Sequence, residues 1–271
     1  MTHLKAAAFD LDDTLLRDDL TFSPYTLDVF RRLHESGFLF VAASGRTRMS
    51  MKPFVDQLNC VSLYISCNGA ELWDPASGNF VYRELLSKDL CHEIARFGNE
   101  YGVYAQTYSD DRFYFNEYSE YSRMYASSSR LPGEFVGDLE NYIQEPRTKI
   151  LMMADPEKIA LMLADAKNRF SGKVSVTCSK PHFLEFNPLS ATKGNALKRA
   201  TALLGLTVND FAAFGDSLND ASMLETAGCS VAVANARPEV IAMCSDVCPS
   251  NQEDGVARYL AARVLNEEAA F

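Results

Sequence analysis

Apolar strand-like segments alternate with helical segments at both ends of this chain, and this alternation is its strongest constraint on fold. Two such segments, FAAF (Phe211–Phe214) and SVAVA (Ser230–Ala234), are apolar almost throughout. Strands have this composition when helices cover both faces of a parallel sheet. The alternation therefore predicts an α/β fold with a Rossmann-like, doubly wound parallel sheet as its core. The expected strands are 4–9, 38–43, 62–66, 211–214 and 230–234; the expected helices are 24–35, 47–58, 193–204, 218–227 and one from residue 238.

The middle of the chain has a different pattern. Segments 102–109 and 112–116 alternate polar and apolar residues, and amphipathic helices are expected at 90–101 and 156–170, with a loop at 127–133. Such strands are typical of an antiparallel sheet, so residues 81–187 are predicted to form an inserted α+β domain between core parts 1–80 and 188–271. For the tyrosines and phenylalanines of 101–125 we favour packing on one face of that sheet; a platform for stacking a sugar or base is the alternative.

Net charge and cysteine usage exclude several classes of protein. A formal net charge of −10 argues against a nucleic-acid binder, which needs a basic surface. The N-terminal apolar run lacks a signal-peptide cleavage pattern and no segment reaches membrane-spanning length, so we expect a cytoplasmic protein without a membrane partner. Seven widely spaced cysteines suit buried thiols in a reducing compartment. Cys244 and Cys248 have no neighbouring His or second Cys pair, so no zinc site is expected there.

Four of the expected strands end in polar residues. In open α/β sheets ligands bind beyond the carboxyl ends of the strands, so these four strand ends form the expected site. Its candidate residues are Asp10 with Asp12, Ser44 with Gly45 and Arg46, Asn68 with Gly69, and Gly215 with Asp216.

Asp10 and Asp12 have one residue between them. If the strand stays extended, their side chains point the same way. One carboxylate of such a pair can attack phosphorus while the other moves protons to the leaving group and from water. An Asp-rich turn without catalytic function explains the segment equally well.

Asp216 and Asp220 add acid at the end of another strand. With Asp10, Asp12 and Asp13 they would repel an anionic phosphate, because two like unit charges about 4 Å apart repel each other by roughly 4 kcal/mol at an effective dielectric near 20. A divalent cation is therefore expected, and the all-oxygen ligand set favours Mg²⁺. Asp220 also has a structural alternative, a capping box with Ser217 that starts the helix at Leu218.

Phosphate also needs hydrogen-bond donors. Ser44 offers a hydroxyl, Gly45 lets its backbone N–H approach closely, and the next helix starts nearby with its positive end. Lys193 lies in the first turn of its helix, where a cation opposes the helix dipole, so a role toward phosphate is favoured over helix stability; a solvated surface lysine is the alternative. Three interpretations of Arg46 are left open: it clamps phosphate, it contacts the second domain, or it forms a surface salt bridge.

In order and spacing, four segments resemble the motifs of the haloacid dehalogenase superfamily of phosphohydrolases. They are DLDDT (10–14), ASGR (43–46), SATKG (190–194) and GDSLND (215–220). CNGA (67–70), ANARPEV (234–240) and NQEDGVA (251–257) further resemble its Cof-type subfamily, in which a large class IIB cap is inserted between the second and third motifs. The predicted insertion falls at that position.

This resemblance implies a role for each matching residue. Asp10 is implied as nucleophile and Mg²⁺ ligand, and Asp12 as general acid/base with its carbonyl on the metal. Asp216 is implied as a metal ligand, supported by Asp220. The phosphate or substrate is implied to be held by Ser44, Gly45, Arg46, Asn68, Gly69, Lys193 and Asn219.

One residue departs from the family pattern. Asp13 stands where relatives usually have glycine, so an easy positive φ is not expected there.

The sequence thus predicts a Mg²⁺-dependent phosphatase acting on small phosphomonoesters, sugar phosphates or similar, through an aspartyl-phosphate, with specificity set by the cap. A phosphosugar mutase with the same Asp pair and a non-catalytic phosphometabolite sensor are the alternatives. The physiological substrate and the oligomeric state are left open.

Overall fold

The computed structural model describes residues 4–109 and 112–267. They form two compact units: the core unit, which comprises the described residues of 1–82 and 192–271, and the inserted unit, which comprises those of 83–191. The inserted unit starts two residues and ends four residues later than the predicted segment 81–187. The later start has a structural reason, because Asn79–Arg83 form a strand that belongs to the sheet of the core unit. Residues 1–3 and 268–271 of the predicted core parts lie outside the described residues.

The core unit is built on a mixed sheet that is mostly parallel. Its described strands follow the order β14-β13-β12-β1-β2-β3-β4-β5, and neighbours from β14 to β3 run parallel. Strand β4 runs antiparallel to β3. The bounds are β1 (Ala6–Phe9), β2 (Leu39–Ala43), β3 (Val61–Ser66), β4 (Glu71–Asp74), β5 (Asn79–Arg83), β12 (Phe211–Gly215), β13 (Cys229–Val233) and β14 (Asp246–Cys248).

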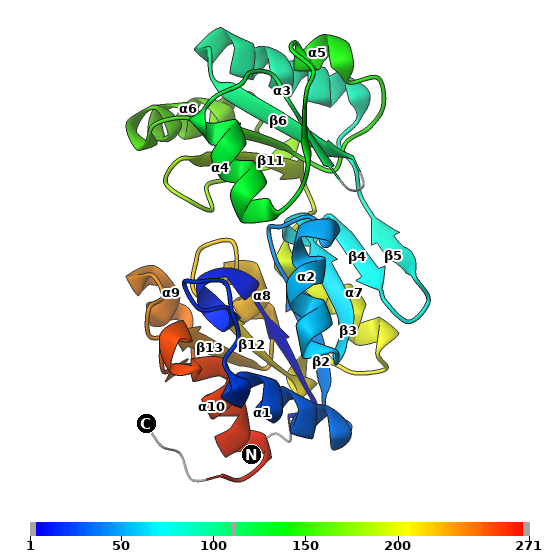
Figure 1. The fold of residues 1–271 in the computed structure, drawn as a ribbon, viewed down its shortest axis with the longest axis vertical. Helices are drawn as coiled ribbons and strands as arrows, with labels where there is room; N and C mark the ends of the chain where they lie inside the picture. Colours follow the sequence, from blue (N-terminus) through cyan, green and yellow to red (C-terminus); the bar gives the residue numbers. More distant parts are fainter. Residues whose placement is uncertain (1–3, 110–111, 268–271) are drawn as a thin grey trace. The chain divides into compact units, whose positions relative to one another are not determined.

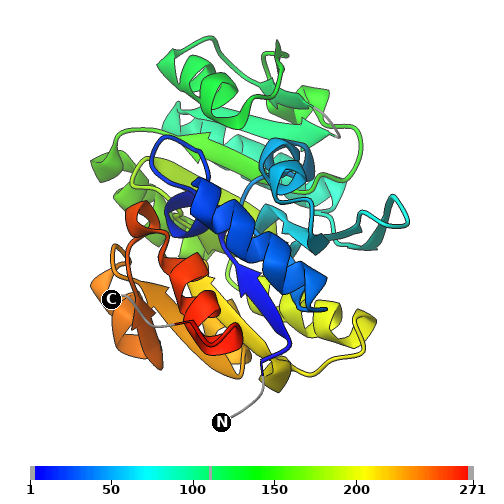
Figure 2. The ribbon, with the colours of Figure 1, turned by 60° about the horizontal axis from the view of Figure 1, so that its bottom comes forward.

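Helices cover both faces of this sheet, which confirms the predicted α/β fold. Helix α1 packs beside α2 and α10, and α7 packs beside α8; Figure 2 shows α1 and α10 side by side in front of the sheet. The bounds are α1 (Pro24–Glu35), α2 (Arg48–Leu58), α7 (Lys193–Leu203), α8 (Ala221–Thr226), α9 (Pro238–Met243) and α10 (Gly255–Val264).

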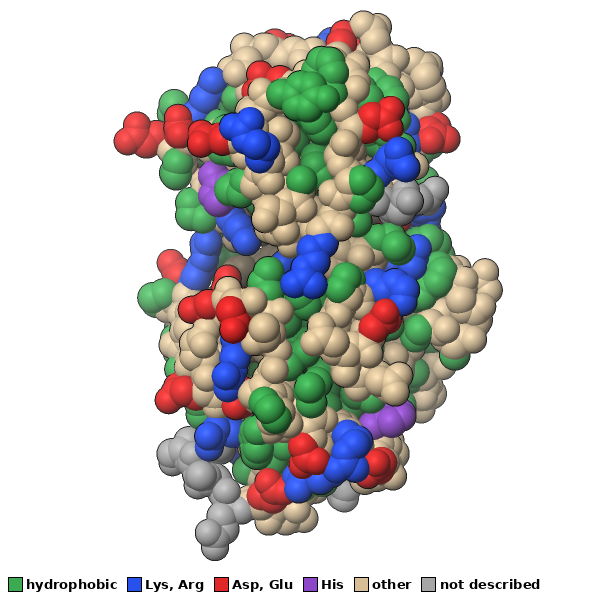
Figure 3. Space-filling model, in the orientation of Figure 1, with side chains coloured by type: hydrophobic (Ala, Val, Ile, Leu, Met, Phe, Trp, Pro, Cys, Tyr) green, Lys and Arg blue, Asp and Glu red, His purple; other side chains and the backbone are tan. Residues whose placement is uncertain are grey.

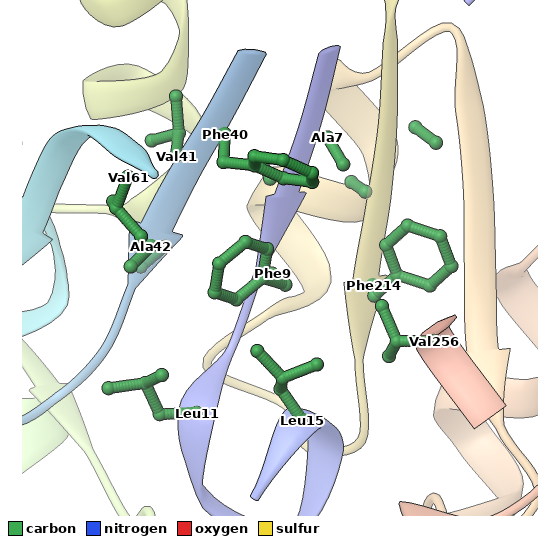
Figure 4. Close-up of a cluster of buried hydrophobic side chains, with 14 of the residues drawn as sticks. Ala7, Phe9, Leu11, Leu15, Phe40, Val41, Ala42, Val61, Phe214 and Val256 are labelled. Carbon is green, nitrogen blue, oxygen red and sulfur yellow. The ribbon is translucent and has the colours of Figure 1, made fainter. Parts of the chain in front are cut away.

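The interior of the core unit is dry and rich in phenylalanine. The ring of Phe30 stacks on Phe40 at 4.5 Å between centroids and meets Phe9 edge-on at 5.4 Å. Leu11 and Leu15, which follow β1, point into the same cluster (Figure 4). These two leucines anchor the loop after β1 in the core, so the loop holds a defined position.

The predicted helix 218–227 is wrong at its start, since α8 begins at Ala221. The side chain of Asp220 explains the shorter helix: its Oδ2 accepts hydrogen bonds from the backbone N–H groups of Asp216 and Ser217, both at 3.1 Å. This is one half of the expected capping box, and it closes a turn in place of the first helical turn.

The inserted unit is a separate α+β structure (Figure 1), as the predicted fold class requires. Its described strands follow the order β10-β11-β9-β6-β7-β8, and most neighbours run antiparallel. The strands are β6 (Tyr104–Ser109), β7 (Arg112–Phe115), β8 (Gly133–Phe135), β9 (Ile150–Met153), β10 (Val174–Thr177) and β11 (Phe183–Pro188), and the helices are α3 (Lys88–Tyr101), α4 (Glu120–Ser129), α5 (Leu139–Tyr142) and α6 (Pro156–Arg169).

Most aromatic side chains of segment 101–125 pack within this unit. The ring of Phe113 lies 5.6 Å from Phe115 and 5.0 Å from Tyr125, and all three residues are buried. This agrees with the packing interpretation. Residues 127–129, expected in a loop, are instead the last turn of α4. A capping box between Ser119 and Ser122 starts this helix at Glu120, and the helix continues to Ser129.

Acidic and basic side chains are mixed on the molecular surface. Among the described residues on the face in Figure 3, no continuous basic area is visible. No helix in the described part of the chain is long and apolar enough to span a membrane.

Candidate active site

The loop that follows β1 has an unusual backbone conformation. Asp13 adopts φ 58° and ψ 4°, so its backbone is in the left-handed region although the residue is not glycine. Aspartate is one of the few other residues that tolerate this region. Its carbonyl oxygen accepts a 2.7 Å hydrogen bond from Asn235 Nδ2, which holds the loop from outside. The expectation that Asp13 forbids a positive φ is therefore wrong.

Adjacent strands bring Asp10 and Asp216 to one edge of the sheet. Strand β1 pairs with β12, and the backbone N–H of Asp10 donates to the carbonyl of Phe214 at 3.1 Å. Carboxylate oxygens of Asp10, Asp216 and Asp220 lie within 4.8 Å of one another. We call these three residues the acidic cluster.

Lys193 is the cation of this cluster. Its ammonium lies 2.5 Å from Asp10 Oδ1 and 2.5 Å from Asp220 Oδ1, and its side chain is 0% exposed. The first residue of α7 is thus held by two carboxylates that offset the unfavourable helix dipole. Close packing of α7 needs a glycine at position 194, where a Cβ atom would lie 2.2 Å from the carbonyl oxygen of Ser222.

The cluster shifts the pKa values of its members. Burial raises the pKa of Asp10 well above its usual value, Lys193 opposes this, and the neighbouring aspartates add to it. Burial, and next the charge of Asp220, raise the pKa of Asp216 to about 7. Burial alone would lower the pKa of Lys193, but Asp10 and Asp220 raise it above its usual value. Lys193 therefore stays charged near neutral pH.

The acidic cluster has the donor set for a hard divalent cation. Both oxygens of Asp220 are occupied, by Lys193 and by backbone N–H groups. In contrast, Oδ2 of Asp10 and Oδ2 of Asp216 have no hydrogen-bond partner among the described residues. Two carboxylate oxygens next to an excess of negative charge fit Mg²⁺, which takes few protein ligands and keeps its other positions for water or phosphate.

Arg46 binds Asp12 with two hydrogen bonds. Its Nε and Nη2 donate to the two carboxylate oxygens, each at 2.7 Å. The guanidinium is held further by Nη1 donating to Ser50 Oγ at 3.0 Å and by the ring of Phe54 at 5.0 Å. Arg46 thus holds the carboxylate of Asp12 in a fixed orientation. Of the three possibilities for Arg46, the structure shows an ion pair within the core unit.

A set of tight turns lies at the ends of β2 and β3. The hydroxyl of Ser44 accepts from the N–H of Arg46 at 3.1 Å, and the carbonyl of Ser44 accepts from the N–H of Asn68 at 3.0 Å. Asn68 has φ 56°. Gly69 has φ 103°, and a Cβ atom there would lie 2.3 Å from the carbonyl oxygen of Thr192. The turn thus places Asn68 beside Gly45 and next to the start of α7.

Asn68 carries the clearest sign of an absent ligand among these turns. Its Oδ1 accepts from Asn219 Nδ2 at 3.2 Å, but its own Nδ2 is buried without a hydrogen-bond partner in the described residues. A buried unsatisfied N–H costs roughly 1–3 kcal/mol. An oxygen of a bound ligand would satisfy it.

Three residues complete the site without having been assigned a role from the sequence. Thr14 donates from Oγ1 to Asp216 Oδ1 at 3.0 Å. Asn235 supports the carbonyl of Asp13 and accepts from the N–H of Asn251, whose Nδ2 donates to the carbonyl of Leu16. Thr14 lies inside the DLDDT segment, and the two asparagines lie in the ANARPEV and NQEDGVA segments. These segments are recognisable in the sequence, but the contacts of the three residues are visible only in the structure.

The core unit therefore joins most of the predicted site residues. Asp10, Lys193, Asp216 and Asp220 are in direct contact or within 4.8 Å, Asp12 pairs with Arg46, and Ser44, Asn68 and Asn219 are joined by hydrogen bonds. This arrangement offers one carboxylate near a cation site and a lysine, and a second carboxylate held separately by arginine. Such a pair can perform nucleophilic attack and proton transfer on a phosphate ester.

Comparisons with known proteins agree with this chemistry. The family model of haloacid dehalogenase-like hydrolases matches residues 7–260. A 5-amino-6-(5-phospho-D-ribitylamino)uracil phosphatase of Bacillus subtilis (strain 168) is 29% identical over 262 residues, covering 97% of this chain and 96% of that protein. The crystal structure of a haloacid dehalogenase-like hydrolase from Bacteroides thetaiotaomicron has a TM-score of 0.87 at 26% identity, covering 95% of this chain and 98% of that one. A sugar phosphatase described as subclass IIB shares the fold, with a TM-score of 0.83 at 20% identity.

Proposed function

The chain belongs to the haloacid dehalogenase-like hydrolase family, and on this premise we propose that it is a Mg²⁺-dependent phosphatase of small phosphomonoesters. The resemblance noted in the sequence is thereby confirmed at the level of family and fold. The proposal adds the metal, the aspartyl-phosphate and the roles of individual residues. The contact that carries it is the pairing of Lys193 with Asp10 beside Asp216.

In the first step, an oxygen of Asp10 attacks the phosphorus atom in line with the ester bond. A P–O bond forms to Asp10 and the bond to the leaving oxygen breaks, while Asp12 gives that oxygen its proton. Lys193 neutralises charge on the transferring group. Its position between two carboxylates keeps it protonated, so it serves as a fixed positive charge.

In the second step, water attacks the phosphorus of the aspartyl-phosphate. Asp12 takes one proton from this water, the bond between phosphorus and Asp10 breaks, and inorganic phosphate leaves. Arg46 holds Asp12 in one orientation during both transfers, through its two 2.7 Å hydrogen bonds. We assign Arg46 as a positioning residue for this reason, in addition to the substrate-binding role expected from the sequence.

Mg²⁺, when bound, supplies electrostatic stabilisation to the phosphoryl oxygens. Asp10 and Asp216 would hold it through their unoccupied oxygens, with the backbone carbonyl of Asp12. Asp220 supports the site by binding Lys193 and the turn at Asp216. Ser44, Gly45, Asn68 and Gly69 would bind phosphate oxygens; the unpaired Nδ2 of Asn68 supports this assignment.

The substrate class follows from similarity. The relative from Bacillus subtilis is named for a substrate that carries a phosphorylated ribityl chain, and it aligns with nearly the whole of this chain. We propose phosphorylated sugars, sugar alcohols or comparable small metabolites as substrates. The inserted unit is proposed to act as the cap that selects among them.

Phosphate release from a panel of phosphomonoesters tests this function. The parent protein should release phosphate with Mg²⁺ and lose this activity with EDTA, and Asp10→Asn should be inactive. Glu35→Gln, an exposed carboxylate in α1, is the control and should retain full activity. Activity that survives Asp10→Asn would disprove the nucleophile, and transfer to a second hydroxyl without free phosphate would indicate a mutase.

A further inference from the structure

One cavity of the core unit is lined by none of the residues assigned to catalysis. It has a volume of about 500 Å³ and lies between α2 and the strands β3 and β4. Cavities that hold small molecules measure roughly 300–1,000 Å³. The volume is therefore sufficient for a metabolite.

An arginine with unused hydrogen-bond donors lines this cavity. The guanidinium of Arg48 lies over the ring of Trp73 at 4.2 Å and near Phe80 at 5.8 Å. No hydrogen bond or ion pair of its side chain is found among residues 4–109 and 112–267. The guanidinium is planar by its own delocalisation, and its contact with the indole restricts its orientation, so its N–H groups can bind a carboxylate or phosphate group.

Neutral polar groups accompany this arginine. Tyr64 is only 8% exposed, yet its hydroxyl has no hydrogen bond to any described residue. Ser62, two residues before Tyr64 and on the same face of β3, also lines the cavity, and its hydroxyl is likewise without a hydrogen-bond partner in the described part of the chain. Both hydroxyls are therefore available to donate to, or accept from, a molecule in the cavity.

The charge of the lining is positive although the protein is acidic. Lys52 pairs with Asp56 at 2.6 Å, which cancels the charge of both. Arg48 then contributes a net positive charge, and His34 lies on the same lining. The lining therefore favours an anion over a neutral or cationic molecule.

We propose that this cavity binds a small organic oxyanion at a site separate from the acidic cluster. Arg48 binds its phosphate or carboxylate group, and Tyr64 and Ser62 bind its remaining polar atoms. The proposal does not depend on the phosphatase mechanism, because the cavity shares no residue with it.

The chain has a single tryptophan, and it lies in this cavity, so intrinsic fluorescence reports binding directly. The experiment titrates the full-length protein in EDTA with propylphosphonate, with succinate, and with glycerol as the neutral probe. At least one of the two anions should change the emission of Trp73 saturably, below about 10 mM, whereas glycerol should not. Comparison of the phosphonate with the dicarboxylate identifies the preferred anion.

Variants locate the binding. Arg48→Gln should weaken it about tenfold or more, because a hydrogen bond to a charged group is lost, and Tyr64→Phe should weaken it severalfold. Arg199→Gln is the matched control, since Arg199 also stacks on an aromatic ring, that of Tyr82 at 3.9 Å, but does not line the cavity. Circular dichroism checks that each variant is folded.

Two results would overturn the proposal. One is the absence of a saturable change with either anion. The other is a change that persists in both Arg48→Gln and Tyr64→Phe but disappears in Asp216→Asn, which would place the anion at the acidic cluster.

Discussion

Replacing Lys193 with methionine removes the cation between two buried carboxylates while keeping a side chain of similar length. Lys193 is 0% exposed and lies 2.5 Å from both Asp10 and Asp220. Removing one partner of a buried ion pair costs roughly 3–5 kcal/mol, because the remaining charge is left uncompensated. With a third carboxylate, Asp216, within 4.8 Å, we expect the upper part of this range.

This loss is a large fraction of the total stability, which is about 5–15 kcal/mol for most domains. At roughly 2–4 °C per kcal/mol for a chain of this size, a loss of about 4–5 kcal/mol should lower the melting temperature by about 8–20 °C. Thermal unfolding in EDTA, followed by far-ultraviolet circular dichroism near pH 8, measures it. Lys198→Met is the control, because this residue lies in the same helix but is exposed and should change the melting temperature little.

The loss should depend on the remaining carboxylates. Adding Asp220→Asn to Lys193→Met should restore part of the stability, since one of the two uncompensated charges is removed. The loss should also shrink at lower pH, where Asp10 with its raised pKa takes up a proton. A melting temperature for Lys193→Met within about 2 °C of the parent near pH 8 would refute the assignment of Lys193 as the counter-charge.

The remaining predictions concern pH, positioning and packing. Burial raises the pKa of the Asp216 carboxyl from 3.8 to about 7, so its protonated form stabilises the fold in EDTA below pH 3.8, and this stabilisation is lost as the pH rises through about 7. Chemical unfolding should show this decline in stability with pH, and the decline should be smaller in Asp216→Asn. Stabilisation by added Mg²⁺ should be larger near pH 8 than near pH 6, as melting curves would show, since the metal binds the carboxylate form. Arg46→Gln should lower kcat by about tenfold or more with a smaller change in KM and a shifted pH profile, and Arg46→Lys should recover part of kcat; an unchanged kcat would contradict the positioning role. Gly194→Ala should destabilise the fold by roughly 1–3 kcal/mol, because its Cβ atom would lie 2.2 Å from the Ser222 carbonyl, and an unfolding midpoint equal to the parent's would contradict this.

The sequence alone indicated the α/β class of the core unit and five of its parallel strands, but not β4, β5 and β14. Apolar strands such as Phe211–Phe214 are decided by local composition, and α1 covers the range 24–35 that the sequence predicts. These signals are short-range, so they can be read without tertiary structure. The same holds for the change to polar alternation in the inserted unit.

The sequence also indicated which polar residues come together at one edge of the sheet, because residues at the carboxyl ends of parallel strands converge by topology alone. It did not determine their partners. The sequence allowed three interpretations of Arg46. Only the fold brings its Nε within 2.7 Å of the carboxylate of Asp12, a residue 34 positions away. Asn235 and Thr14 were not assigned, because their importance rests on single hydrogen bonds to the loop after β1 and to Asp216.

Asp13 shows the limit of local rules most clearly. Steric preference at one residue disfavours a positive φ, but the buried Leu11 and Leu15, together with the Asn235 hydrogen bond, fix the loop on both sides. Such contacts, distant in the sequence, outweigh a backbone cost of about 1–2 kcal/mol. Local composition thus determined which elements form and which strand ends carry acids, whereas long-range packing decided which carboxylate meets Lys193, which meets Arg46, and how the loop between them is held.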